Sequence, residues 1–200
     1  MWDASQDWSV VDGVGSGREG PRIAPNASSV ALSNIESRFL NARREVGFVV
    51  DGQTGRILAV RRAQLGNGTE IRLSAHRDYP LMRNNIFTHN HPLGGNFSPG
   101  DVASALGSGV AEFRAFSATR TLSIRFETPP DKLLGSPERA VLFMDAEKAA
   151  IGARYRSDVS TGSIVPPADP IAKKVFLSDY FMDQLVARNS WIKYISTPHN

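Results

Sequence analysis

The chain has 200 residues, 41% of them hydrophobic, which is enough for one domain with its own core and an appended element. Its 23 Lys and Arg face 20 Asp and Glu, a formal net charge of +3 with no long run of one sign, so composition disfavours nucleic acid as a partner. Cysteine is absent, which excludes disulfides and thiolate metal sites. Any bound metal must therefore have nitrogen and oxygen ligands.

The sequence shows neither a standard secretion signal nor a membrane span. The first seven residues lack the basic and apolar regions of a secretion signal, and no apolar run reaches the roughly 18 residues of a membrane span. We therefore expect a soluble cytoplasmic protein without a membrane segment. If it acts outside the cell that makes it, it must be delivered without a standard signal peptide.

The N-terminal part of the chain changes character twice. Residues 1–28 are rich in Gly, Ser, Asp and Pro, which is typical of a flexible leader. Ser33 and Glu36 have the spacing of a capping box, which predicts that a helix begins there. Apolar runs at 46–50 and 56–60, joined by a Gly- and Asp-bearing loop, then predict a β-hairpin.

The middle of the chain alternates between strand and helix signals. We expect a strand near 69–74 and a short buried strand at 86–88. Ser98-Pro99-Gly100-Asp101 has the cap, first-position and first-turn residues of a helix that extends to about Leu106. Alternating apolar residues at 110–116 and 122–126 predict two more strands.

After Pro129-Pro130 the pattern becomes helical. One helix is expected from Ser136, with its apolar face formed by Leu142, Ala146, Ala149 and Ala153. A second helix carries Val175 to Leu185, and residues 191–195 close the chain as an edge strand. The order of elements indicates an α/β or α+β domain at 29–128, after the leader at 1–28 and before a helical extension at 129–200 that offers a surface to a partner protein.

The most informative segment is Thr88-His89-Asn90-His91-Pro92, followed by Asp101. In an extended strand, residues i and i+2 point to the same side, so His89 and His91 can face one ion. Asp101, in the first turn of the next helix, supplies a third ligand. Two imidazoles and one carboxylate leave a tetrahedral position open for water, as in catalytic zinc sites.

Two further residues complete the candidate site. Glu45 lies where the first predicted helix runs into the first strand, and its carboxylate is our candidate for general base and acid. Ser98 is a candidate donor to the oxyanion of an attacked carbonyl. Read alone, Ser98 and Asp101 are a helix cap with a favourable first-turn acid, a role compatible with the first.

Together, Glu45, His89-Asn90-His91-Pro92 and Ser98-Pro99-Gly100-Asp101 resemble the pattern of the JAB/MPN metalloprotease (JAMM) family and its RadC-like bacterial relatives. The resemblance covers roughly Leu32 to Phe126. It implies a mixed β-sheet flanked by helices, with zinc on His89, His91 and Asp101, Glu45 as general base and acid, and Ser98 supporting the tetrahedral intermediate. One departure is that the segment between His91 and Ser98 is one residue shorter than is usual in the family.

The sequence thus favours a zinc-dependent hydrolase that cleaves a peptide or isopeptide bond in a protein substrate. Two alternatives stay open. A metal-dependent nuclease is one, because His-Asn-His-Pro segments also occur in phosphodiester-cleaving sites and the chain is mildly basic. The other is a non-catalytic interaction module of a phage or toxin system, which the leader and the helical extension suggest.

Overall fold

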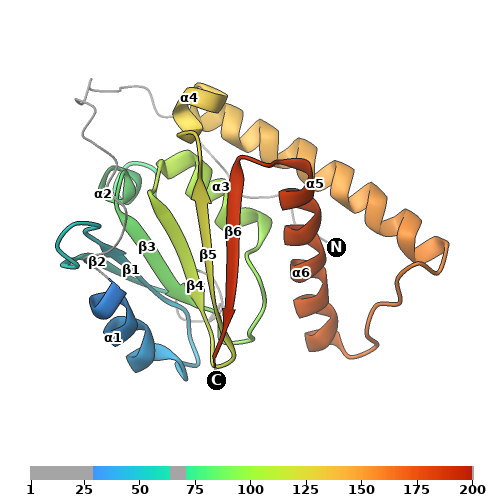
Figure 1. Ribbon diagram of the computed structural model, residues 1–200, viewed down its shortest axis with the longest axis horizontal. Coiled ribbons are helices and arrows are strands. Elements are labelled where there is room, and N and C mark those ends of the chain that lie inside the picture. The colour runs from blue at the N-terminus through green and yellow to red at the C-terminus, as the bar shows by residue number, and fades with distance from the viewer. Residues whose placement is uncertain (1–28, 64–70, 200) are drawn as a thin grey trace.

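The computed structural model describes residues 29–63 and 71–199 (Figure 1). The predicted leader at 1–28 lies outside these residues. The elements, in chain order, are α1 (Ser29–Phe39), β1 (Val46–Val50), β2 (Ile57–Arg62), α2 (Tyr79–Met82), β3 (Ile86–Asn90), α3 (Pro99–Ser108), β4 (Glu112–Phe116), β5 (Arg120–Phe126), α4 (Pro130–Leu134), α5 (Pro137–Ser160), α6 (Pro170–Arg188) and β6 (Ile192–Pro198).

The strands form one mixed sheet in the order β2-β1-β3-β4-β5-β6, which confirms the predicted α/β class. Every neighbouring pair is antiparallel except β3 and β4, which are parallel. A parallel pair needs a crossover connection, and here α3 provides it. The crossover brings the first turn of α3 close to the C-terminal end of β3.

The predicted hairpin is confirmed by β1 and β2. Asp51 fixes its turn, because one carboxylate oxygen accepts hydrogen bonds from the backbone N–H groups of Gln53 and Thr54 at 2.9 and 2.8 Å. On β1, Gly47 allows a close approach to the neighbouring strand. A Cβ atom there would lie 2.6 Å from the Phe87 ring, so any larger residue would displace a core side chain.

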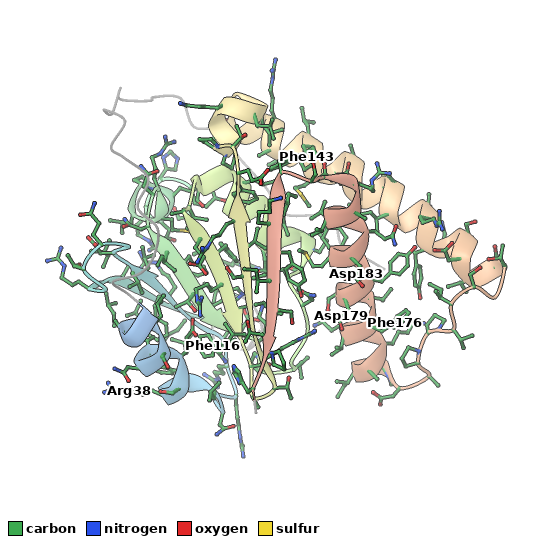
Figure 2. All side chains as sticks on the ribbon, in the orientation of Figure 1. Arg38, Phe116, Phe143, Phe176, Asp179 and Asp183 are labelled. Carbon is green, nitrogen blue, oxygen red and sulfur yellow. The ribbon has the colours of Figure 1, made fainter. Side chains whose placement is uncertain are left out.

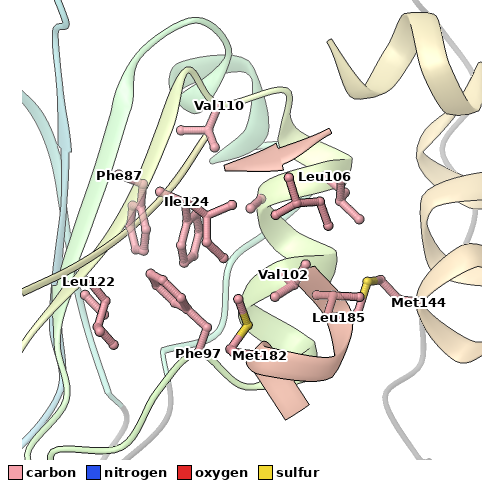
Figure 3. Packing of buried hydrophobic residues seen from close by; sticks show 14 of the residues in the cluster. Phe87, Phe97, Val102, Leu106, Val110, Leu122, Ile124, Met144, Met182 and Leu185 are labelled. Atoms are coloured by element: carbon pink, nitrogen blue, oxygen red, sulfur yellow. The ribbon is translucent and has the colours of Figure 1, made fainter. Parts of the chain in front are cut away.

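Helices cover the sheet unequally. On one face α1 packs over β1 and β3, and its contacts form a small cluster around Leu32, Phe48 and Ile86. The other face carries the main core, in which side chains from β3 to β6 meet α3, α5 and α6 (Figure 3). Phe87, Phe97 and Phe113 lie at its centre and are each at most 1% exposed.

The C-terminal segment shares this main core. Met144 of α5 and Met182 and Leu185 of α6 belong to the same cluster as the sheet residues (Figure 3). Phe143 of α5 lies near the junction of α6 and β6, where its ring contacts Trp191 at a centroid distance of 5.6 Å (Figure 2). The predicted last strand is confirmed as β6, which pairs with β5 over seven residues and forms the sheet edge.

Three local predictions are wrong. The capping box at Ser33 does not start a helix, because α1 already contains Ser29 and Glu36 is buried inside the fold. The described part of the strand expected near 69–74, residues 71–74, has no strand structure. The face of α5 predicted to pack is exposed at all four positions, Leu142, Ala146, Ala149 and Ala153, with Leu142 at 67%, while Ala140, Met144 and Ile151 are buried.

No helix in the described parts of the chain combines the length and the apolar character that crossing a membrane requires.

Candidate metal centre

His89 in β3 and His91, the residue that follows the strand, lie on the same side of the sheet. The side chain of His89 is 3% exposed and that of His91 is 10% exposed, so both imidazoles are almost removed from water. Asn90 points to the opposite face, as strand alternation requires. Its Oδ1 accepts from the Val46 backbone N–H at 2.6 Å, and its Nδ2 donates to the carbonyl of Arg44 at 3.1 Å. Asn90 therefore fastens the segment that enters β1 to the end of β3.

Asp101 reaches the same point from the first turn of α3. Ser98 is the N-cap of this helix and Pro99 follows it, as the sequence predicted. The Ser98 backbone N–H and hydroxyl both donate to Asp101 Oδ2, at 2.7 and 2.8 Å, and Asp101 N–H donates back to Ser98 Oγ at 3.2 Å. This capping box leaves Asp101 Oδ1 3.5 Å from His89 Nε2.

The two imidazoles direct the same ring atom at each other. His89 Nε2 and His91 Nε2 are 2.8 Å apart, and their Nδ1 atoms lie 2.9 Å from the carbonyl oxygens of Arg114 and Gly95. A carbonyl can only accept, so both Nδ1 atoms carry the proton and a neutral ring keeps its lone pair on Nε2. In metal-binding proteins, a hydrogen bond from the other ring nitrogen to a backbone carbonyl fixes the tautomer and the orientation of a ligating histidine.

His89, His91 and Asp101 form what we call the three-ligand cluster. One ligand atom from each lies within 4.8 Å of the others, a grouping that could hold a metal ion. Two nitrogens bound to zinc at 2.0–2.1 Å in tetrahedral geometry stand about 3.3 Å apart. The 2.8 Å between the Nε2 atoms therefore has to widen by only a few tenths of an ångström.

The pKa shifts of the three side chains also favour a positive charge within the cluster. Burial works against charge on His89, but its hydrogen bond and charge interaction with Asp101 outweigh burial and raise its pKa. Burial and the neighbouring His89 lower the pKa of His91 to about 4. Burial opposes charge on Asp101 as well, yet the two histidines hold its pKa below its usual range. Without a metal, these shifts favour a protonated His89 next to a charged Asp101 and a neutral His91.

Glu45 lies next to the cluster without belonging to it. In the antiparallel pairing of β1 with β3, Gly47 faces His89, so continuing the register places Glu45 opposite His91. Glu45 Oε2 accepts from the Ile71 backbone N–H at 3.2 Å, and the Glu45 charge is among the causes that raise the pKa of His89. The structure thus brings together the glutamate and the three ligand residues that the sequence predicted.

The Ser98 hydroxyl is engaged with Asp101, which confirms the expected helix cap. To donate to an oxyanion, this hydroxyl would have to turn away from the carboxylate. Its role in stabilising an intermediate stays a prediction.

The residues that hold the loop between His91 and Ser98 were not predicted from the sequence. Asn96 in this loop is 5% exposed, and its backbone N–H donates to Ser178 Oγ at 2.8 Å. Its Nδ2 donates to the Tyr194 hydroxyl at 2.7 Å and to Asp179 Oδ1 at 3.1 Å. Helix α6, which carries Asp179 (Figure 2), and strand β6 therefore both fix the loop.

Arg120 adds a second attachment for the same loop. Its Nη2 donates to the Gly94 carbonyl at 3.3 Å and to Asp179 Oδ1 at 2.7 Å. Because Gly95 supplies the carbonyl behind His91, fixing this stretch also fixes that ring. The only sequence signal was Gly94-Gly95, which indicates a tight loop but not its partners.

Comparisons of the chain with protein-family models, curated proteins and solved structures gave no match. The resemblance to the JAB/MPN family therefore stays a prediction from the motif.

Proposed function

We propose that this protein is a zinc-dependent hydrolase that cleaves a peptide or isopeptide bond, a JAMM-like metallopeptidase. The observation that carries the proposal is the convergence of two imidazole Nε2 atoms and one carboxylate, with Glu45 beside them. Backbone carbonyls fix both rings in the tautomer that binds metal. The nitrogen and oxygen ligands suit zinc, and three protein ligands leave one position for a water molecule.

When bound, zinc would supply Lewis acidity that lowers the pKa of a water from 15.7 to about 7. His89, His91 and Asp101 would hold the ion, and the loop contacts of Asn96 keep His91 in place. Glu45 accepts the proton that the attacking water loses and delivers it to the leaving amine. The near-complete burial of the His89 and His91 side chains excludes competing water from their rings and strengthens their interactions.

Metal content and one substitution test the proposal. The purified protein should carry about one zinc per chain, measured by mass spectrometry of its metals. Glu45→Gln should keep this zinc but lose hydrolysis of a randomised mixture of internally quenched peptides by about 100-fold or more. Glu127→Gln is the matched control, because Glu127 lies at the surface and pairs with Lys193 at 2.9 Å.

A protein without zinc would contradict the proposal. Zinc lost together with activity in Glu45→Gln would contradict the role of Glu45. Magnesium-stimulated cleavage of DNA or RNA, with no peptide cleavage, would favour a nuclease instead.

A further inference from the structure

Helices α5 and α6 enclose a groove of about 480 Å³. The two helices diverge toward the loop that joins them, and the groove lies between the diverging parts (Figure 1). Its volume falls in the range of sites that take a small molecule or a few side chains of a peptide. We call it the α5/α6 groove, and it is lined by Pro99, Asp145, Lys148, Ala149, Ile151, Gly152, Tyr155, Arg156, Lys173, Leu177, Tyr180 and Phe181.

The floor of the groove is apolar. Ile151 and Phe181 lie at its base and are each 4% exposed. The rings of Tyr155 and Tyr180 meet edge to face at a centroid distance of 5.4 Å and line the same cavity. A large aliphatic or aromatic side chain is the occupant that such a floor favours.

The rim of the groove is basic. Lys148, Arg156 and Lys173 line it together with a single carboxylate, that of Asp145. Among the residues that the structure describes, neither Arg156 nor Lys173 is paired with a carboxylate. Unpaired cations around an apolar floor complement a ligand that carries negative charge beside an apolar group.

Helices α3 and α6 connect the groove to the three-ligand cluster. Pro99 lines the groove, while Asp101, two residues later in α3, belongs to the cluster. On α6, Leu177 lines the groove and its neighbour Ser178 holds Asn96 of the His91–Ser98 loop.

We propose that the α5/α6 groove binds an acidic segment of the peptide substrate, with a large apolar side chain on the floor and carboxylates on the basic rim. This inference rests on the proposed peptidase function and names the class of its substrate. The groove shares no residue with the three-ligand cluster, so its residues are expected to affect KM and not the bond-breaking step.

Binding to the metal-free protein tests the groove separately from hydrolysis. The probe is a fluorescein-labelled peptide that alternates glutamate with leucine and contains one tryptophan. Its control is the same peptide with lysine in place of glutamate. Fluorescence anisotropy in the presence of a chelator should show binding of the glutamate peptide only, and binding should weaken as salt is raised.

Charge reversal at the rim should abolish this preference. The double variant Arg156→Glu with Lys173→Glu should bind the glutamate peptide about tenfold more weakly. The control Arg139→Glu with Lys174→Glu changes two exposed cations of the same helices that do not line the groove, and it should bind like the wild type. Leu177→Ala should also weaken binding, because it removes apolar surface from the groove.

Equal affinity for the two peptides, or an unchanged affinity in the double variant, would overturn the inference. If the glutamate peptide binds in the groove but no peptide is cleaved by the zinc-loaded protein, the groove is a binding site for an acidic segment and the proposed peptidase function is wrong. If peptides are cleaved with an unchanged KM in the double variant, the peptidase function is supported and the inference about the groove is wrong.

Discussion

Two clusters of buried polar side chains lie on opposite faces of β3 and β4, and they are built in opposite ways. The three-ligand cluster lies on the face covered by α3. On the face covered by α1 lies what we call the ionic cluster, formed by Glu36, Glu112, Arg114 and Arg125. Arg114 connects the two, because its backbone carbonyl faces His89 Nδ1 while its side chain pairs with Glu36.

In the ionic cluster, donors meet acceptors. The Arg114 guanidinium donates to both oxygens of Glu36, at 2.8 and 3.0 Å, and to Glu112 at 2.9 Å. Ser123 donates to Glu112 at 2.6 Å and Arg125 donates to it at 2.9 Å. Each buried carboxylate is therefore matched by cations within the protein.

In the three-ligand cluster, the protein supplies no permanent cation. Two imidazole Nε2 atoms and a carboxylate converge, and the described residues provide no Lys or Arg that pairs with them, so a proton on His89 or a bound metal ion has to balance the charge of Asp101. Both clusters contain side chains that are almost fully buried, so burial alone does not identify a site. The difference lies in whether the protein supplies the counter-charge or leaves that place for an ion.

The largest expected effect concerns zinc affinity. His91→Ala removes one of three ligands, so zinc affinity should fall by well over the roughly 100-fold that losing an outer contact costs. A chelator should lower the melting temperature of the wild type and leave that of the variant unchanged, because only a bound ion stabilises the fold. His76→Ala, at an exposed position, is the control. Full zinc content in His91→Ala would show that the three-ligand cluster does not bind the metal.

The ionic cluster should show the opposite response. Arg114→Met leaves two buried carboxylates without their shared cation, which should lower the free energy of unfolding by about 3–5 kcal/mol. Zinc content should be retained, since the Arg114 carbonyl that orients His89 is unchanged. Urea denaturation in the presence of a chelator measures the loss.

Arg154→Met provides the matched comparison for Arg114→Met. Arg154 is 66% exposed and pairs with Asp158 four residues later, so its loss should cost less than about 1 kcal/mol. Similar losses in the two variants would show that the ionic cluster contributes no more than a surface pair.

The two clusters also differed in how well the sequence predicted them. His89 and His91 are two residues apart at the end of β3, and Asp101 follows in the next helix, so local periodicity and capping rules were enough to group them. The same rules predicted the hairpin, β3, α3 and β6. Each of these elements has a local signal in the sequence, although β6 pairs with β5, more than 60 residues earlier.

The ionic cluster could not be predicted in this way. Glu36 pairs with Arg114, 78 residues away, and its local pattern suggested a helix cap instead. Asn96 and Tyr194 are 98 residues apart, and no periodicity links them. Similarly, the apolar face of α5 depends on how that helix packs against α3, which the amphipathic pattern of α5 alone did not indicate.

A smaller effect on zinc is expected from the loop contacts. Asn96→Ala removes the hydrogen bonds to Tyr194 and Asp179, and zinc affinity should fall about 10- to 100-fold as His91 loses its fixed orientation. Tyr194→Phe removes one of these bonds and should have a weaker effect. Competition with a chromophoric chelator gives the dissociation constants. A loss of stability with an unchanged zinc affinity would assign Asn96 to the fold alone.

The smallest expected effect is on how the free energy of unfolding changes with pH in the acid range. Burial by itself would raise the pKa of Glu112, but the Arg114 charge, the Ser123 hydroxyl and the Arg125 charge outweigh it and lower that pKa. Stability from Glu112 is therefore complete above its unfolded pKa of 4.5 and is lost as pH falls through the lower folded value. Unfolding free energies measured from about pH 5 to about pH 3 should fall less steeply in Glu112→Gln. An identical slope would show that other carboxylates control acid unfolding.

The hydrogen bond between Asn96 and the Tyr194 hydroxyl also determines when the site can be completed during synthesis of the chain. The ribosome releases His89, His91 and Asp101 long before β6, so all three ligands are present while the loop between them still lacks its last anchor. The loop can reach its final geometry only after β6 has emerged from the ribosome. Tight zinc binding is then expected to begin once β6 is free to pair, so a nascent chain stalled before Tyr194 should not hold the metal firmly.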